Sequence, residues 1–225
     1  MYSLIAQWLS LPAQATLAEV QRALEAQNGL GEQPPVVAFL ITSQERSALP
    51  GCNPSTNEQV FVTEGDEPRL GVFIAESVLE ALPLTASALS LADVAALDGY
   101  CVAFEGVSHF LCLAHRADRE RSVSLFELEL QAEVDKFVHL TQKLAIEPGS
   151  PAQHALLETL FERYALRDDL SAIEAARYRE ATRHAAKFCH RLSKAARAEK
   201  SNAVVFREAR SFFDLPLEAK LRRAA

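Results

Sequence analysis

The chain has 225 residues, of which 49% are hydrophobic and 24% charged, so its composition is that of a globular protein and not of a disordered one. Its four cysteines include no CxxC pair, which excludes the common zinc knuckles and dithiol redox motifs, and they are too few for a disulfide scaffold. The net charge of −7 divides unevenly, because residues 174–225 carry 13 Lys/Arg and 6 Asp/Glu, whereas residues 1–173 carry 10 and 24.

Export and membrane signals are weak in this sequence. The N-terminal segment has no basic residue before its short apolar run, so it does not resemble a secretory signal. The longest apolar stretch, residues 100–114, is interrupted by Glu105 and His109 and is too short and too polar to span a bilayer. We therefore expect a cytoplasmic protein with reduced thiols and no membrane partner.

The first predicted elements are a helix and a strand. Thr16 and Glu19 have the spacing of a capping box, and the helix that they begin is predicted to end at Asn28-Gly29. After two prolines, the β-branched and aromatic run 36–42 is typical of a buried strand. Residues 43–57 follow as a loop, because they are rich in Ser, Pro, Gly and Asn.

A hairpin and a connecting segment follow. Apolar runs at residues 59–63 and 70–75 flank a turn that contains Gly65, and this pattern predicts two antiparallel strands. Residues 76–82 read as a short helix. Pro83 and the Ser/Ala-rich stretch up to residue 90 form a connection, which is the candidate domain boundary.

Residues 91–121 admit two interpretations. Phe104-Glu105-Gly106-Val107 could form the turn of a hairpin. The polar residues, however, recur at intervals of three and four, which is helical periodicity: Glu105, Ser108, His109, Cys112 and Arg116. We favour the helix, although Gly106 inside a helix costs roughly 1 kcal/mol relative to alanine.

Helix signals dominate the rest of the chain. Ser124 with Glu127, and Ser171 with Glu174, have the capping-box spacing, and they begin helices that run to about residues 145 and 200. An apolar stripe between them predicts a further helix over residues 153–166. The remaining residues are too apolar for an unattached tail, so we expect them to pack on the body of the protein.

Together these elements predict an α+β fold. A small antiparallel sheet with a helix covers residues 1–89. A helical bundle of four or five helices covers residues 90–225 and ends in a basic helix and an apolar C-terminal segment. The linker is short and not very polar, which leaves open whether the two parts share one core.

Familiar catalytic signatures do not occur in the sequence. There is no GxGxxG, GxxxxGK[ST], HExxH, GxSxG or EF-hand pattern. With only 8 glycines, the chain also has little material for loops that cradle phosphates. This excludes the common classes of nucleotide-binding enzyme, and no catalytic residue is assigned.

A metal site is one hypothesis that the spacing supports. Glu105 and His109 are one helical turn apart, and so are Glu129 and Glu133 on the next predicted helix. Carboxylates and imidazoles from facing helices hold iron, manganese or zinc in helical bundles. We favour a structural role, in which Glu105 and His109 pair with each other or with a nearby basic residue, and the carboxylates of the next helix form a solvated acidic face.

A basic face is the second candidate site. The helix from residue 171 to residue 200 carries a narrow, alanine-rich apolar stripe and a row of basic residues on its other faces, including Arg179, Arg183, Lys187, Arg191 and Lys194. Such a face can pair with acidic residues within the protein or between subunits, dock an acidic protein, or contact the phosphates of a nucleic acid. We rank these in that order, because the whole chain is acidic and offers few aromatics for stacking on bases.

The expected function follows from the charge division and from the missing catalytic motifs. We expect a non-enzymatic interaction or regulatory protein that acts through the basic helix and the acidic body, with a protein partner or self-association. The alternative is a metal-dependent enzyme or metal-binding helical protein that uses the Glu/His cluster.

Overall fold

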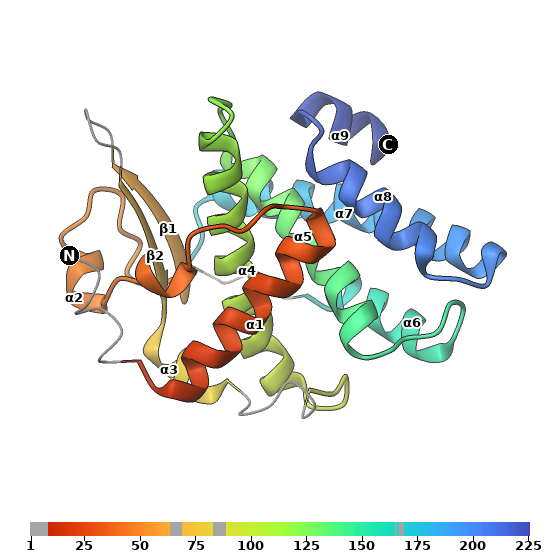
Figure 1. Cartoon of the computed structure of the whole chain (residues 1–225), viewed down its shortest axis with the longest axis horizontal. Coiled ribbons are helices and arrows are strands. Elements are labelled where there is room, and N and C mark those ends of the chain that lie inside the picture. The colour runs from red at the N-terminus through yellow and green to blue at the C-terminus, as the bar shows by residue number, and fades with distance from the viewer. Residues whose placement is uncertain (1–8, 64–68, 83–88, 165, 167–168) are drawn as a thin grey trace. The chain divides into compact units, whose positions relative to one another are not determined.

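The computed structural model describes residues 9–63, 69–82, 89–164, 166 and 169–225 (Figure 1). Within them the chain combines a two-stranded antiparallel sheet with a helical C-terminal region, which confirms the predicted α+β class. The chain forms two compact units, and each is described by itself. Unit 1 comprises residues 1–25 and 31–120, and unit 2 comprises residues 26–30 and 121–225. The boundary that the sequence predicts after residue 89 would separate two independently folding parts, and it stays a prediction.

The hairpin of unit 1 consists of β1, Glu58–Thr63, and β2, Arg69–Ile74. The two strands pair antiparallel with Val60 opposite Val72, as the alternating pattern predicts. Most of β2 is buried, from Gly71 to Ile74. The predicted turn at Gly65 lies outside the described residues.

Helix α1, Leu11–Asn28, begins earlier than predicted. The hydroxyl of Ser10 accepts a hydrogen bond from the backbone of Ala13 at 3.4 Å, so Thr16 lies inside the helix and does not cap it. Its buried stripe contains Leu17 and Leu24, which lie seven residues apart on one face of the helix. Gly29, whose φ is 67°, follows the last helical residue, as predicted.

The strand predicted over residues 36–42 is wrong in most of its length. Val36–Ala38 form a short 3₁₀ turn, η2, and only Leu40 forms a bridge, parallel to Val72. A side chain explains the missing strand. The amide oxygen of Gln21 accepts a hydrogen bond from the backbone N–H of Val36 at 2.7 Å. That bond occupies a donor that a strand would direct to its neighbour. Helix α2, Ser43–Ser47, then begins within the predicted loop.

Helix α4, Val94–Ala117, settles the ambiguous segment in favour of the helix. It packs on the hairpin and on α3, Glu76–Ala81. A Cβ atom at Gly106 would lie 3.1 Å from Cγ of Glu58 and 3.2 Å from Cγ1 of Ile74. Gly106 is therefore the point of close approach between the helix backbone and the hairpin, which explains why a residue unfavourable in helices occurs here.

Unit 2 is built around α5, Leu125–Lys143, and α7, Ala172–Glu199, which pack extensively on each other. The buried face of α7 is lined by small residues such as Ala181 and Ala185, which let the helix backbones approach closely. The capping box of Ser171 and Glu174 is present in both directions, at 3.2 and 2.9 Å. At α5, Ser124 caps the backbone of Glu127 at 3.1 Å, as predicted.

Three shorter elements complete unit 2: α6, Pro151–Leu157, α8, Ala203–Phe213, and α9, Leu217–Arg223. A π-helical turn, η4, Glu158–Glu162, continues α6. The predicted packing of the apolar C-terminal residues is confirmed, because Phe212 is fully buried and stacks on Phe188 of α7 with 4.3 Å between ring centroids. Within the described part of the chain, no helix combines the length and apolarity that crossing a membrane requires.

Candidate metal-binding site

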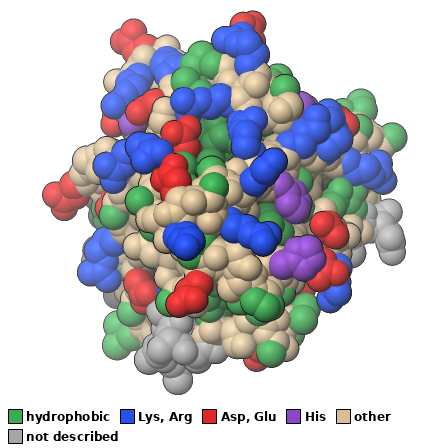
Figure 2. All heavy atoms as spheres, turned by 90° about the vertical axis from the view of Figure 1, so that its right-hand side faces the viewer, with side chains coloured by type: hydrophobic (Ala, Val, Ile, Leu, Met, Phe, Trp, Pro, Cys, Tyr) green, Lys and Arg blue, Asp and Glu red, His purple; other side chains and the backbone are tan. Residues whose placement is uncertain are grey.

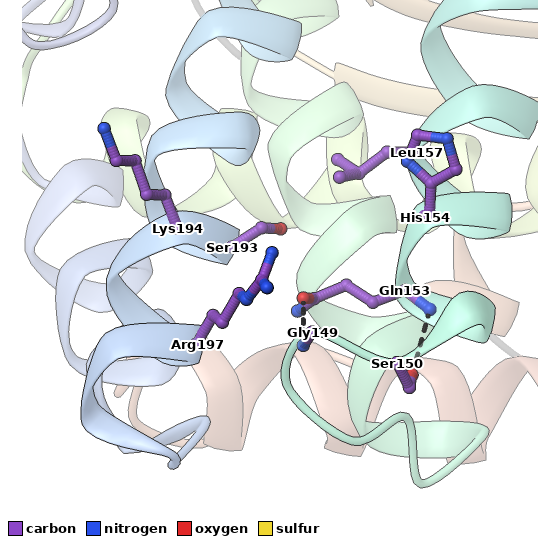
Figure 3. Close-up of a pocket in the computed structure, with 8 residues that line it drawn as sticks. All are labelled: Gly149, Ser150, Gln153, His154, Leu157, Ser193, Lys194 and Arg197. Carbon is purple, nitrogen blue, oxygen red and sulfur yellow. Dashed lines mark hydrogen bonds between the residues drawn. The ribbon is translucent and has the colours of Figure 1, made fainter.

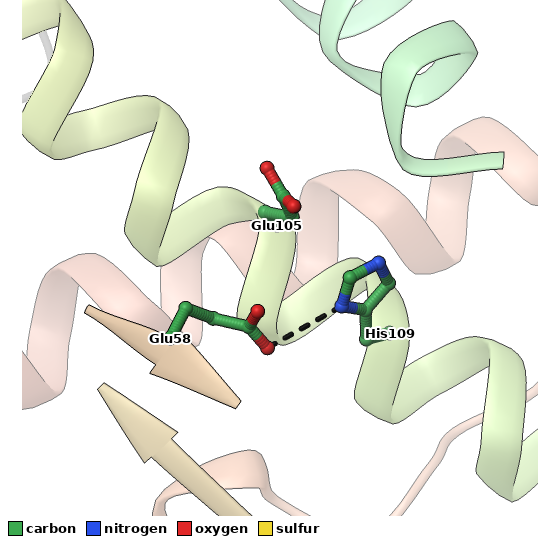
Figure 4. Close-up of side chains that lie close together, drawn as sticks. All are labelled: Glu58, Glu105 and His109. Carbon is green, nitrogen blue, oxygen red and sulfur yellow. Dashed lines mark hydrogen bonds and ion pairs between the residues drawn. The ribbon is translucent and has the colours of Figure 1, made fainter. Parts of the chain in front are cut away.

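Three side chains of unit 1 converge where α4 crosses the hairpin (Figure 4). Glu105 and His109 come from successive turns of α4, and Glu58 is the first residue of β1. The Nδ1 atom of His109 lies 3.3 Å from Oε1 of Glu58. One nitrogen or oxygen from each of the three side chains lies within 4.8 Å of the others, so the group could surround a single cation.

The local structure explains why these side chains meet. Residues four apart on a helix share a face, which places Glu105 beside His109. Glu58 is held at the end of its strand, because it pairs with Ile74 and its carbonyl accepts the Thr56 hydroxyl at 2.6 Å. Gly106 leaves room for the Glu58 side chain to pass along the helix.

The burial of the cluster favours specific binding over loose association with ions. The His109 side chain is only 5% exposed and that of Glu58 12% exposed. Carboxylate oxygens and imidazole nitrogens bind zinc, manganese and iron at about 2.0–2.2 Å, which places ligands of one ion roughly 3–3.5 Å apart. The 3.3 Å between Glu58 and His109 lies in that range, and the flexible side chain of Glu105 can move from its position within 4.8 Å of both.

The other two predicted ligands belong to unit 2 and have basic neighbours there. Glu129 lies 3.7 Å from the guanidinium of Arg177 on α7, and Glu133 lies 2.8 Å from the ammonium group of Lys136. Their participation in a metal site stays a prediction. Glu58 was not predicted, because it precedes His109 by 51 residues and nothing in its local pattern indicates a ligand.

The polar face of α5 differs from the solvated acidic face that the sequence suggested as an alternative. Glu127 and Glu129 are buried, with 5% and 7% exposure. Glu127 forms an ion pair of 3.0 Å with Lys220 of α9, which is itself fully buried. Asp135 is buried as well and accepts hydrogen bonds from the amides of Gln27 and Gln131, both at 2.9 Å. The acidic residues are therefore part of the core of unit 2.

The basic residues of α7 remain at the surface. Arg179, Arg183, Lys187, Arg191 and Lys194 are all exposed. Arg183 pairs with Glu180 one turn earlier, at 2.6 Å, and the guanidinium of Arg191 donates to the carbonyl of Arg223. The face drawn in Figure 2 carries Lys and Arg side chains over much of its area, interrupted by acidic ones. Internal neutralisation therefore involves Arg177 and Arg183, whereas all five predicted binding residues are exposed.

Buried titratable groups elsewhere are held in their neutral forms. Burial, with a smaller contribution from Lys143, lowers the pKa of His139 to about 3. Burial is also the largest cause that raises the pKa of the Cys189 thiol, with nearby Glu133 and Asp135 adding to it. The Tyr100 pKa is raised above its usual value, mainly by burial. The neutral thiol of Cys189 and the neutral phenol of Tyr100 are poor nucleophiles and poor metal ligands, since ligation by a thiol requires its ionised form.

Comparisons with known proteins give no family for this chain: no family model, curated protein or solved structure matches it.

Proposed function

We propose that the protein binds a divalent metal ion through Glu58, Glu105 and His109. The observation that supports this is the convergence of two carboxylates and one imidazole within 4.8 Å, in a largely buried position on the hairpin and α4. This donor set suits zinc, manganese or iron, which accept mixed oxygen and nitrogen ligands.

Three protein ligands leave at least one coordination position for water or a substrate, which is the arrangement of catalytic and not of structural zinc sites. A metal ion held in this way lowers the pKa of a bound water and polarises a substrate oxygen. The proposal is therefore a metal-dependent enzyme of the hydrolytic type. The ligands would come from β1 and α4, whose close packing depends on the missing side chain of Gly106.

Elemental analysis of the purified, tag-free protein tests the metal. We expect about one ion per chain after incubation with zinc, manganese or iron and removal of the excess. Glu58→Gln and His109→Ala should each lose it, whereas the exposed Glu80→Gln should retain it as a control of equal charge change. A chain without bound metal under all three conditions, or a Glu58→Gln variant that binds as tightly as the natural chain, contradicts the proposal.

Glu129→Gln and Glu133→Gln decide whether α5 contributes. If both variants keep the ion with unchanged affinity, the site consists of the three residues of unit 1. If either loses it, the carboxylates predicted on α5 belong to the site as well. Circular dichroism of each variant separates loss of a ligand from loss of the fold.

A second candidate function is binding of an acidic protein partner, or of a second copy of the chain, through the basic face of α7. The observation that favours it is the exposure of all five predicted basic residues on one helix. Electrostatic complementarity of this kind accelerates association and selects partners. Reversing Arg183, Lys187 and Arg191 to Glu should abolish capture of the partner, or self-association in light scattering. Reversal of the exposed Arg163, Arg207 and Arg222 is the matched control, and equal behaviour of the two variants contradicts this function.

A further inference from the structure

Unit 2 contains a pocket between α6 and α7 (Figure 3). Ser150, Gln153 and His154 line one side, and Ser193, Lys194 and Arg197 line the other. Its volume is about 200 Å³. That is below the roughly 300 Å³ at which pockets for drug-sized ligands begin, so it suits a small chemical group and not a complete cofactor.

The charge of the lining has one sign. Its ionisable side chains are His154, Lys194 and Arg197, and no carboxylate takes part. Among the described residues, neither Lys194 nor Arg197 forms an ion pair within 4.0 Å. Because the lining carries positive side chains and no carboxylate, such a pocket favours a negatively charged ligand over a cation.

Two buried side chains of the pocket have unused hydrogen-bonding groups. Gln153 is 3% exposed and Ser193 is 7% exposed. The Nε2 atom of Gln153 and the Oγ atom of Ser193 have no hydrogen-bond partner within the described part of the chain. Buried polar groups normally have partners, since a protein gains nothing from desolvating them alone. Both groups line the pocket, so a ligand there would complete their hydrogen bonding.

The turn before α6 fixes the direction of these donors. The backbone N–H of Gly149 donates to Oε1 of Gln153 at 2.8 Å, which identifies the oxygen of that amide and leaves its amino group as the unused end. Gly149 has a φ of 74°, and a Cβ atom there would lie 3.0 Å from Cγ of Arg197. The glycine therefore permits the turn and also the packing of the Arg197 stem against it.

The close-up in Figure 3 shows how these groups point. The amide of Gln153, the hydroxyl of Ser193 and the guanidinium of Arg197 extend toward the space between the two helices. The ammonium group of Lys194 points away from it. Two helices thus supply three kinds of donor, and one of them is permanently charged.

We propose that this pocket binds the phosphate group of a small molecule. The ionised oxygens of a phosphate group accept hydrogen bonds, and the guanidinium fork matches a pair of them. The hydroxyl of Ser193 and the amino group of Gln153 supply the uncharged donors that fix the remaining oxygens. The site does not depend on the metal proposal, because Glu58, Glu105 and His109 lie in unit 1.

A titration of the full-length protein with inorganic phosphate at constant ionic strength tests the site. We expect saturable shifts in the amide NMR signals of Gly149 and Ser193, which glycerol does not produce. Glycerol 3-phosphate is the second probe, since tighter binding than inorganic phosphate identifies an organic phosphate as the ligand and equal binding identifies the free ion. Either result supports the pocket, whereas the absence of saturable shifts with both probes overturns it.

Three variants test the geometry. Arg197→Gln should weaken phosphate at least about tenfold, as expected for loss of a charged donor. Gln153→Glu should abolish binding, because it keeps the acceptor for Gly149 N–H and replaces the amino group with a carboxylate oxygen. Lys194→Gln removes the same charge as Arg197→Gln but should weaken binding less than about threefold. Equal losses in these two variants would indicate diffuse attraction and overturn the site. Glu58→Gln should leave phosphate affinity unchanged.

Discussion

Carboxylates that are buried or half-buried occur in both units, but their neighbours differ. On α5 of unit 2, Glu127 lies 3.0 Å from Lys220 and Glu129 lies 3.7 Å from Arg177, so each charge has a positive partner close by. In unit 1, two carboxylates converge on one imidazole. In the first arrangement a Lys or Arg side chain neutralises each carboxylate, whereas the second groups oxygen and nitrogen donors of the kind that divalent cations accept. Burial of an acidic residue is therefore no guide to function until the residues around it are known.

The buried pair of α5 and α9 gives the largest expected effect. Lys220→Met removes the cation and leaves Glu127 buried, which should lower the free energy of unfolding by about 3–5 kcal/mol. Urea denaturation measures it. Adding Glu127→Leu should recover much of the loss, because the double variant has no buried charge at this position. The exposed pair of Arg222 and Glu218 is the control, and Arg222→Met should cost less than about 0.5 kcal/mol.

The buried His139 of α5 should make the free energy of unfolding depend on pH. Burial lowers its folded-state pKa to about 3, whereas the unfolded chain takes up the proton near 6.5. Between pH 3 and pH 6.5 the unfolded state therefore binds more protons than the folded state. The contribution of the neutral His139 to the free energy of unfolding is complete above pH 6.5 and decreases as the pH falls toward 3. The slope should approach 1.4 kcal/mol per pH unit below about pH 6. Urea denaturation at pH 7 and pH 5 should show it, and His139→Gln should reduce the slope by one proton.

Gly106→Ala tests the cluster of unit 1. The added Cβ meets Cγ of Glu58 at 3.1 Å, so the Glu58 side chain must move. The gain in helix propensity and the steric cost are each about 1 kcal/mol, so the stability should change by no more than about that amount. Metal binding should weaken at least about tenfold, because one ligand is displaced. Unchanged metal affinity in a folded Gly106→Ala protein would show that the close approach of Gly106 does not position Glu58 for the metal.

The exposed basic face should matter least to stability. Lys187→Ala is expected to change the free energy of unfolding by less than about 0.5 kcal/mol, as for most surface substitutions. Urea denaturation checks this. A larger loss would mean that the basic face is part of the folded core, and it would remove the reason for assigning a partner to it.

Local signals predicted the elements well where local physics decides them. The hairpin follows from alternation, α4 from three- and four-residue spacing, and α7 from the cap at Ser171. The prediction that Thr16 begins the first helix was wrong, because the spacing of a capping box can occur by chance inside a helix, and Ser10 caps this one. The prediction of a strand at residues 36–42 was wrong because the side chain of Gln21, 15 residues earlier, accepts a hydrogen bond from the Val36 N–H.

The candidate sites depend even more on contacts between residues that are far apart in the sequence. Helical spacing places Glu105 beside His109, which is a local property. Glu58 reaches them only through the pairing of the hairpin and its packing on α4, which spacing does not encode. Likewise, Glu127 looks like a surface carboxylate because its partner Lys220 follows 93 residues later. Long-range pairs decide whether an acidic residue is solvated, neutralised or available to a ligand.

The two buried thiols have a practical consequence. Cys112 lies in unit 1 and Cys189 in unit 2, and both are buried. A thiol reagent can modify such a group only after local or global opening, so its rate reports the population of the open state. Each unit of the natural chain therefore contains one buried thiol whose rate of modification reports its opening. Mass spectrometry of the two modified peptides can time the opening of each unit separately, with and without metal or phosphate, and no engineered label is needed.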